Sequence, residues 1–96
     1  MEYLAVEWNH NLPDMPNKIY SELDGQRMEV RKVEVFRNGS MGYASAAAST
    51  GSSKLGIEAI PPIREIATQA EFKPRPSTRQ EFESMWTLAT GKGRVA

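Results

Sequence analysis

The sequence predicts an α+β fold, in which an antiparallel β-sheet of four to five strands is packed on one face by two C-terminal helices. Three observations predict it: apolar and polar residues alternate over several short segments before residue 46, an Asn-Gly pair follows the longest of them, and two segments after residue 60 have helical apolar spacing. A chain of 96 residues can bury one core. We therefore expect a single domain over residues 1–91 and a flexible basic tail over 92–96.

The first two strands are expected at residues 3–10 and 18–24. Leu4, Val6 and Trp8 alternate with residues of the opposite face, as in a half-buried strand. Two prolines within the connecting stretch exclude a central strand there, so this stretch is a loop at one end of the sheet.

The third strand begins at Glu29, where valines alternate with charged residues, and it ends at Asn38-Gly39. Asn-Gly is typical of a two-residue hairpin turn. Such a turn returns residues 40–46 alongside the strand and places Glu34 opposite Tyr43. A one-residue change of register would exchange the two faces.

Residues 44–56 are rich in Ala, Ser and Gly and are expected to form a mobile loop. Residues 55–60 are expected to add a short further strand, which two prolines end. Residues 72–76 are expected to be extended, because they hold two further prolines.

The first predicted helix opens at Pro61-Pro62 and carries an apolar stripe from Ile63 to Ala70. The second has Ser77 or Thr78 as its N-cap and ends at Gly91. The expected core contains Leu4, Val6, Trp8, Ile19, Leu23, Val33, Val35, Ile63, Ile66, Phe82, Met85 and Trp86.

The amino-acid composition argues against several classes of function. Twelve acidic residues balance twelve basic ones, so no overall field attracts nucleic acid or an anionic membrane. The absence of cysteine excludes disulfides, thiolate metal sites and cysteine nucleophiles, and it favours the cytoplasm for so small a domain. No signal peptide and no apolar run of membrane-spanning length is present.

No motif indicates an enzyme, a cofactor or a metal site. His10 is the only histidine, and an enzyme using it with Asp14 or Glu22 is the last of three hypotheses. A two-residue loop at Gly25-Gln26 would place Glu22 opposite Glu29, where two carboxylates could share a proton or a cation. A solvated charge ladder is the simpler interpretation.

Mixed charges with aromatic anchors suit recognition of another protein. The alternative is a small nucleic-acid-binding module that uses a basic and aromatic sheet face. Its residues would be Arg27, Arg31, Lys32, Phe36 and Arg37, but Glu29 and Glu34 interrupt them.

Five segments carry a resemblance to a known family: Tyr3 to Trp8, Ile19 to Asp24, Glu29 to Gly39, Gly42 to Ala44, and Glu81 to Trp86. Together they resemble a family of small bacterial domains of unknown function over nearly the whole chain. The resemblance implies no activity and supplies no catalytic residues. The Ala/Ser/Gly stretch at 44–53 and the basic tail depart from the family pattern.

By analogy with small stand-alone bacterial domains encoded beside toxins, we expect a non-catalytic protein-binding domain. Its role would be that of an immunity or inhibitor protein that blocks a bacterial toxin or nuclease, with acidic side chains imitating phosphates in a basic cleft. The predicted partner-binding residues lie on one exposed sheet face and in the proline-rich loop: Asp14, Glu22, Glu29, Arg31, Glu34 and Tyr43.

Overall fold

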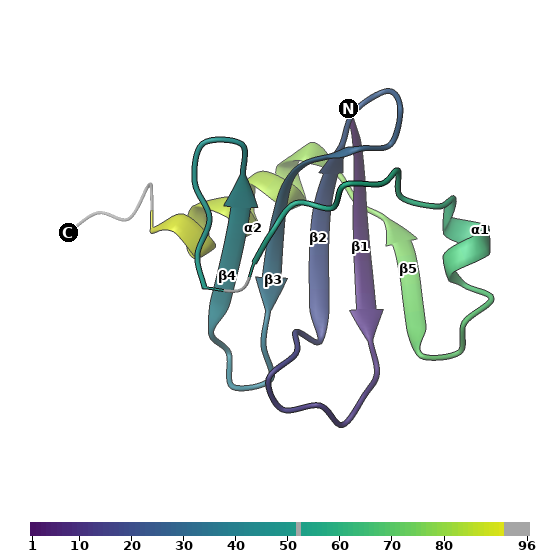
Figure 1. Cartoon of the computed structure of the whole chain (residues 1–96), viewed down its shortest axis with the longest axis horizontal. Helices are drawn as coiled ribbons and strands as arrows, with labels where there is room; N and C mark the ends of the chain where they lie inside the picture. The colour runs from purple at the N-terminus through teal and green to yellow at the C-terminus, as the bar shows by residue number, and fades with distance from the viewer. Residues whose placement is uncertain (52, 92–96) are drawn as a thin grey trace.

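A computed structural model describes residues 1–51 and 53–91 (Figure 1). Its five strands form one antiparallel sheet in the order β4-β3-β2-β1-β5. The α+β class and the antiparallel sheet are confirmed, and the predicted tail over 92–96 lies outside the described residues. The elements in chain order are β1 (Glu2–Trp8), β2 (Lys18–Leu23), β3 (Glu29–Val35), β4 (Met41–Ser45), α1 (Ile63–Ile66), β5 (Phe72–Pro76) and α2 (Arg79–Thr90).

The fifth strand is not where the sequence predicted it. Residues 55–60 form no strand, and the extended stretch Phe72–Pro76 instead pairs with β1. Residues 53–60 cross the front of the sheet from the β4 side toward α1 (Figure 1). Their polar contacts are made with the sheet face, for example between the Gly56 N–H and the Glu29 carboxylate, so they run over the sheet rather than along its edge.

α2 matches its prediction closely. The Thr78 side chain accepts a hydrogen bond from the Glu81 N–H at 3.1 Å, and Gly91 ends the helix with φ +73°. This is the N-cap and left-handed C-cap expected from the sequence. The cap satisfies a backbone donor that the first turn of any helix leaves without a partner.

α1 is much shorter than its apolar stripe predicted and spans four residues, Ile63–Ile66. It contacts β5, whereas α2 contacts β1, β2, β3 and β4. Ile66 lines a cavity with Leu4 and Ile19, whose side chains point away from α2. One face is therefore covered by α2 alone, and the two predicted helices do not share it.

The core is small. Phe82, Leu23 and Val33 have no solvent exposure, Leu4 is 4% exposed, and the alanines at 5 and 44 are buried with them. The other predicted core residues are half-buried: Val6, Trp8, Ile19, Val35, Ile63, Ile66, Met85 and Trp86.

The β3–β4 hairpin has a three-residue turn rather than the expected two-residue one. The Phe36 N–H donates to the Ser40 carbonyl, and Gly39 is left-handed at φ +87°. This is a type I turn closed by a left-handed glycine. Tyr43 consequently faces Val33, and Glu34 faces Gly42, so the predicted pairing of Glu34 with Tyr43 is wrong.

The β2–β3 hairpin also has a three-residue turn, and here Arg27 takes the left-handed position at φ +63°. A bulge also shifts the register of β2 against β3 between Glu22 and Leu23. Glu22 therefore faces Arg31 instead of Glu29, and the predicted pair of facing carboxylates is wrong. The longer turn and the bulge together convert an expected repulsion into an ion pair.

Candidate functional site

Side chains on the α2 face of the sheet form rows, because directly paired residues of antiparallel strands point to the same side. The row under α2 holds Tyr3, Glu22 and Arg31. The next row runs Arg75, Ala5, Tyr20, Val33, Tyr43, and the outermost runs Lys73, Glu7, Lys18, Val35, Met41.

Arg31 connects the row under α2 to the helix itself. Its Nε and Nη2 donate to the two oxygens of Glu22 at 2.7 and 2.9 Å, and Nη2 also donates to Glu83 of α2 at 2.5 Å. The guanidinium lies 4.9 Å from the Phe82 ring centre and 5.0 Å from that of Trp86. Arg31 thus joins the sheet to α2 by charge and by cation–π contact.

Glu22 is a buried member of this cluster, with its side chain 8% exposed. The hydrogen bonds from Arg31 hold its carboxyl pKa below the usual value, against the opposing effect of burial, and a bond from the Tyr3 hydroxyl at 2.8 Å adds to this lowering. Burial and the same bond to Glu22 raise the pKa of Tyr3. Glu22 remains ionised because the hydrogen bonds from Arg31 and Tyr3 compensate for the hydration that burial removes.

Glu29 and Glu34 lie on the opposite face, where residues 53–60 cover them. The Glu29 side chain is 5% exposed, accepts a hydrogen bond from the Gly56 N–H at 2.5 Å and forms an ion pair with the Lys32 ammonium at 3.4 Å. Glu34 accepts from the Ser53 hydroxyl at 2.5 Å. The missing side chain of Gly42, the residue facing Glu34, leaves the room that this hydroxyl occupies.

The five partner-binding residues predicted on the exposed sheet face therefore do not share one face, and the expectation for their placement is wrong. Two of them lie under α2, Tyr43 packs edge-on against Trp86 with ring centres 5.3 Å apart, and two lie under residues 53–60. Asp14 is exposed in the proline-rich loop. The divided set comprises Glu22, Arg31 and Tyr43 on one face, Glu29 and Glu34 on the other, and Asp14 apart.

The basic residues of the nucleic-acid hypothesis are also dispersed. Arg27 donates to the carbonyls of Ile60 and Pro61 at 2.8 and 2.7 Å, and Arg37 donates to the His10 carbonyl at 2.6 Å. Lys32 forms an ion pair with Glu29 of the same strand, as described above. These side chains anchor loops and do not form a common basic face.

His10 holds the loop that follows β1. Its Nδ1 accepts from the Leu12 N–H at 2.9 Å, so Nε2 carries the proton and donates to the Pro16 carbonyl at 2.7 Å. Its ring also packs on Trp8, with centres 4.3 Å apart. Both ring nitrogens thus have structural partners in this geometry.

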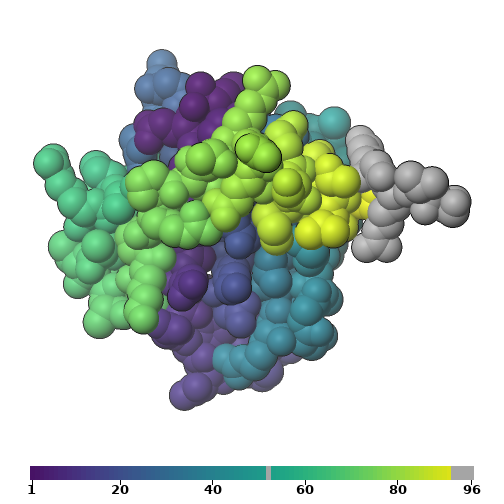
Figure 2. Space-filling view, turned by 180° about the vertical axis from the view of Figure 1, so that it is seen from behind, coloured from purple at the N-terminus to yellow at the C-terminus, as the bar shows by residue number. Residues whose placement is uncertain are grey.

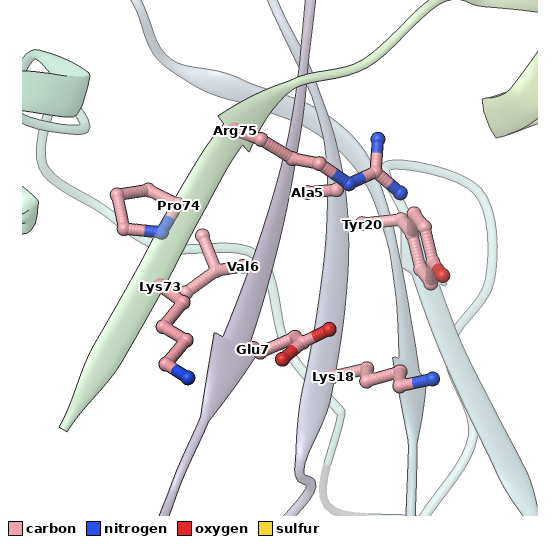
Figure 3. A pocket seen from close by; sticks show the side chains of 8 residues that line it. All are labelled: Ala5, Val6, Glu7, Lys18, Tyr20, Lys73, Pro74 and Arg75. Carbon is pink, nitrogen blue, oxygen red and sulfur yellow. The ribbon is translucent and has the colours of Figure 1, made fainter.

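The open half of the α2 face contains a different cluster. Figure 2 shows the strands emerging below α2, and here the outer two rows form a hollow of about 260 Å³. Ala5 is its small floor between Tyr20 and Arg75, and Figure 3 shows these three above the row of Lys73, Glu7 and Lys18. We call this hollow the basic groove; its lining residues are Ala5, Val6, Glu7, Lys18, Tyr20, Lys73, Pro74 and Arg75.

Arg75 is positioned in the basic groove by the first turn of α2. Its two terminal nitrogens donate to the two oxygens of Glu81, each at 2.8 Å. Arg75 and a hydrogen bond from the Ser77 hydroxyl lower the pKa of Glu81 to about 2. The guanidinium is therefore held in place while about half of its side chain stays exposed.

Neither sheet edge is open to a further strand. The Ser77 N–H donates to the Tyr3 carbonyl at 2.8 Å, so the backbone N–H and C=O groups of the odd-numbered β5 residues are directed at β1. The backbone groups directed away from the sheet belong to Pro74 and Pro76, which have no N–H to donate to a further strand. At the other edge, the Thr50 N–H donates to the carbonyl of Tyr43 in β4 at 3.0 Å. Both features disfavour the addition of a further strand to this sheet.

Residues 2–91 match the model of a family described as "Domain of unknown function (DUF6881)". The chain belongs to this family. No curated protein and no solved structure matches it. Within the described part of this DUF6881 domain, no three His, Asp or Glu side chains are grouped to hold a metal ion. Over the same residues, no helix has the length and apolar character needed to cross a membrane.

Sequence reasoning missed the basic groove of this DUF6881 domain. The signal was present in β5, where Lys73 and Arg75 alternate with prolines, as in a strand with one charged and one apolar side. The strand that pairs with β5 could not be identified from the sequence, because it is β1, some 70 residues earlier in the chain. Only that pairing brings Lys73 and Arg75 beside Lys18 and Tyr20.

Proposed function

We propose that this domain is a non-catalytic protein-binding module that holds an acidic segment of its partner in the basic groove. The observation that carries this is the convergence of three exposed cations around a small alanine floor, Lys18 from β2 with Lys73 and Arg75 from β5. Glu7 is the single acidic residue among them. Tyr20 supplies an aromatic wall of the kind enriched at protein interfaces.

Charge complementarity supports an acidic partner, since Lys18 and Lys73 outnumber Glu7 and the guanidinium of Arg75, although paired with Glu81, stays half exposed. The groove is also preorganised, because Glu81 orders Arg75 before any partner arrives. Both features favour binding without any need for a reacting group.

Inhibition of a bacterial toxin or nuclease in the cytoplasm remains our proposal for the biological role, by analogy alone. The way in which the domain would bind such a target must differ from the expectation that its acidic side chains imitate phosphates. Glu22, Glu29 and Glu34 are occupied by internal hydrogen bonds, so the charges that would meet such a target are the exposed lysines of the groove and the half-exposed Arg75.

Binding of a hexaglutamate peptide tests the proposal. The double variant Lys18→Glu/Lys73→Glu is expected to weaken binding by about tenfold or more, because two attractive charges become repulsive. Isotope-labelled protein monitored by NMR should show the largest amide shifts in β1, β2 and β5.

The matched control is Lys54→Glu, an exposed lysine on the segment that crosses the other face, and it should leave binding unchanged. Equal weakening by Lys54→Glu would refute a specific groove. Tighter binding of an oligothymidine than of hexaglutamate would reject the protein-binding proposal in favour of the nucleic-acid module, which Tyr20 beside three cations would also suit.

A further inference from the structure

A second cavity, of about 330 Å³, lies on the sheet face opposite the basic groove. Its floor is formed by apolar side chains of β1 and β2, and its roof by Ile60, Pro61 and Ile66. Phe72 lines it as well. We call it the apolar cavity; the floor residues are Leu4, Val6 and Ile19.

The roof of the apolar cavity is held in place independently of any ligand. The Arg27 side chain donates hydrogen bonds to the carbonyls of Ile60 and Pro61, the first residues of this roof. The Ile60 N–H in turn donates to the Arg27 carbonyl at 2.8 Å. α1 then follows and contacts β5. A space bounded by two anchored layers is a preformed site, as most small-molecule pockets are.

Polar groups also line the apolar cavity: Ser21, Glu29 and Lys32 from the sheet, with the exposed Glu65 and Gln69 from the roof. The Glu29 oxygens already accept hydrogen bonds from the Ser21 hydroxyl and the Gly56 N–H. Lys32 differs, because its ammonium has three hydrogens and, among the described residues, the contact that the structure gives it is the ion pair with Glu29 at 3.4 Å.

We propose that the apolar cavity binds a small amphipathic carboxylate, whose hydrocarbon part lies between β1, β2 and α1 and whose head group accepts hydrogen bonds from Lys32. The apolar floor and roof supply the contact area. Lys32 is only 16% exposed, so a carboxylate beside it would be largely shielded from water. The proposal does not depend on the function of the basic groove on the other face.

Titration with decanoate, below the concentration at which it forms micelles, tests this proposal. Amide shifts should appear around Leu4, Ile19 and Ile66, and Lys32→Met should weaken binding by about tenfold, since it removes a charge-assisted hydrogen bond and keeps the hydrocarbon stem. Lys32→Arg keeps the charge and should retain most of the affinity. Decanol, which lacks the carboxylate, should bind the unmodified protein about as weakly as decanoate binds Lys32→Met.

Lys18→Met is the matched control, because it removes the same charge on the opposite face, in the basic groove. It should leave decanoate binding unchanged, just as Lys32→Met should leave hexaglutamate binding unchanged, so the two proposals fail separately. Weakening by Lys18→Met equal to that by Lys32→Met, equal affinity for decanol and decanoate, or no amide shifts at millimolar decanoate would each overturn the proposal.

Discussion

Phe82→Ala is expected to lower the free energy of unfolding by about 4 kcal/mol. Phe82 has no exposed surface, and its ring contacts Tyr3 and Trp86 at centroid distances of 5.6 and 6.2 Å. Removing it leaves a cavity at the place where α2 meets the sheet, and it also removes one of the two rings beside Arg31. Urea unfolding followed by tryptophan fluorescence measures the loss directly, since Trp86 packs on the deleted ring.

Leu88→Ala is the control on the same helix. Leu88 is 51% exposed, so its removal should change the unfolding free energy by no more than about 0.5 kcal/mol. Similar losses for the two variants would mean that α2 is not docked through Phe82.

Glu22→Gln is expected to cost about 3 kcal/mol, because it leaves Arg31 with only Glu83 as an anionic partner in a largely shielded position. Glu7→Gln, an exposed change in the neighbouring strand, should be close to neutral. Both can be measured by urea unfolding at neutral pH. A Glu22→Gln variant as stable as Glu7→Gln would contradict a structural role for the ion pair.

The pH dependence of this difference gives a second check. The folded-state pKa of Glu22 lies below its usual value of 4.5, so its contribution is fully present above about pH 4.5 and is lost as the pH falls below that value. The stability gap between the unmodified protein and Glu22→Gln should therefore narrow on acidification toward about pH 3. A gap that stayed constant would show that folding does not lower the pKa of Glu22.

Local patterns predicted most of the elements. Alternation located the first four strands, and the N-cap at Thr78 and the glycine at 91 fixed both ends of α2. These succeed because a cap or an alternating strand depends on residues that are near in sequence. α1 was overestimated, because only Ile63 and Ile66 of its stripe are half-buried and the chain then turns to enter β5.

The site was mispredicted through two turns. Each hairpin has one residue more in its turn than expected, and a one-residue change moves a side chain to a new partner or to the other face. The longer β2–β3 turn together with the bulge beside Leu23 placed Glu22 opposite Arg31 rather than Glu29, and the longer β3–β4 turn directed Tyr43 toward α2. Turn length depends on which residue accepts a left-handed backbone, and Arg27 gives no such signal in sequence.

Photo-crosslinking tests most directly the claim that the basic groove is the binding surface. A Tyr20→p-benzoylphenylalanine variant, illuminated in lysate from the source organism, should form a protein adduct whose yield falls when Lys73→Glu is added. The same probe placed at the exposed Glu58, on the segment crossing the other face, should form none. An adduct of equal yield from both positions, an adduct removed by nuclease, or no adduct at Tyr20 would contradict the account.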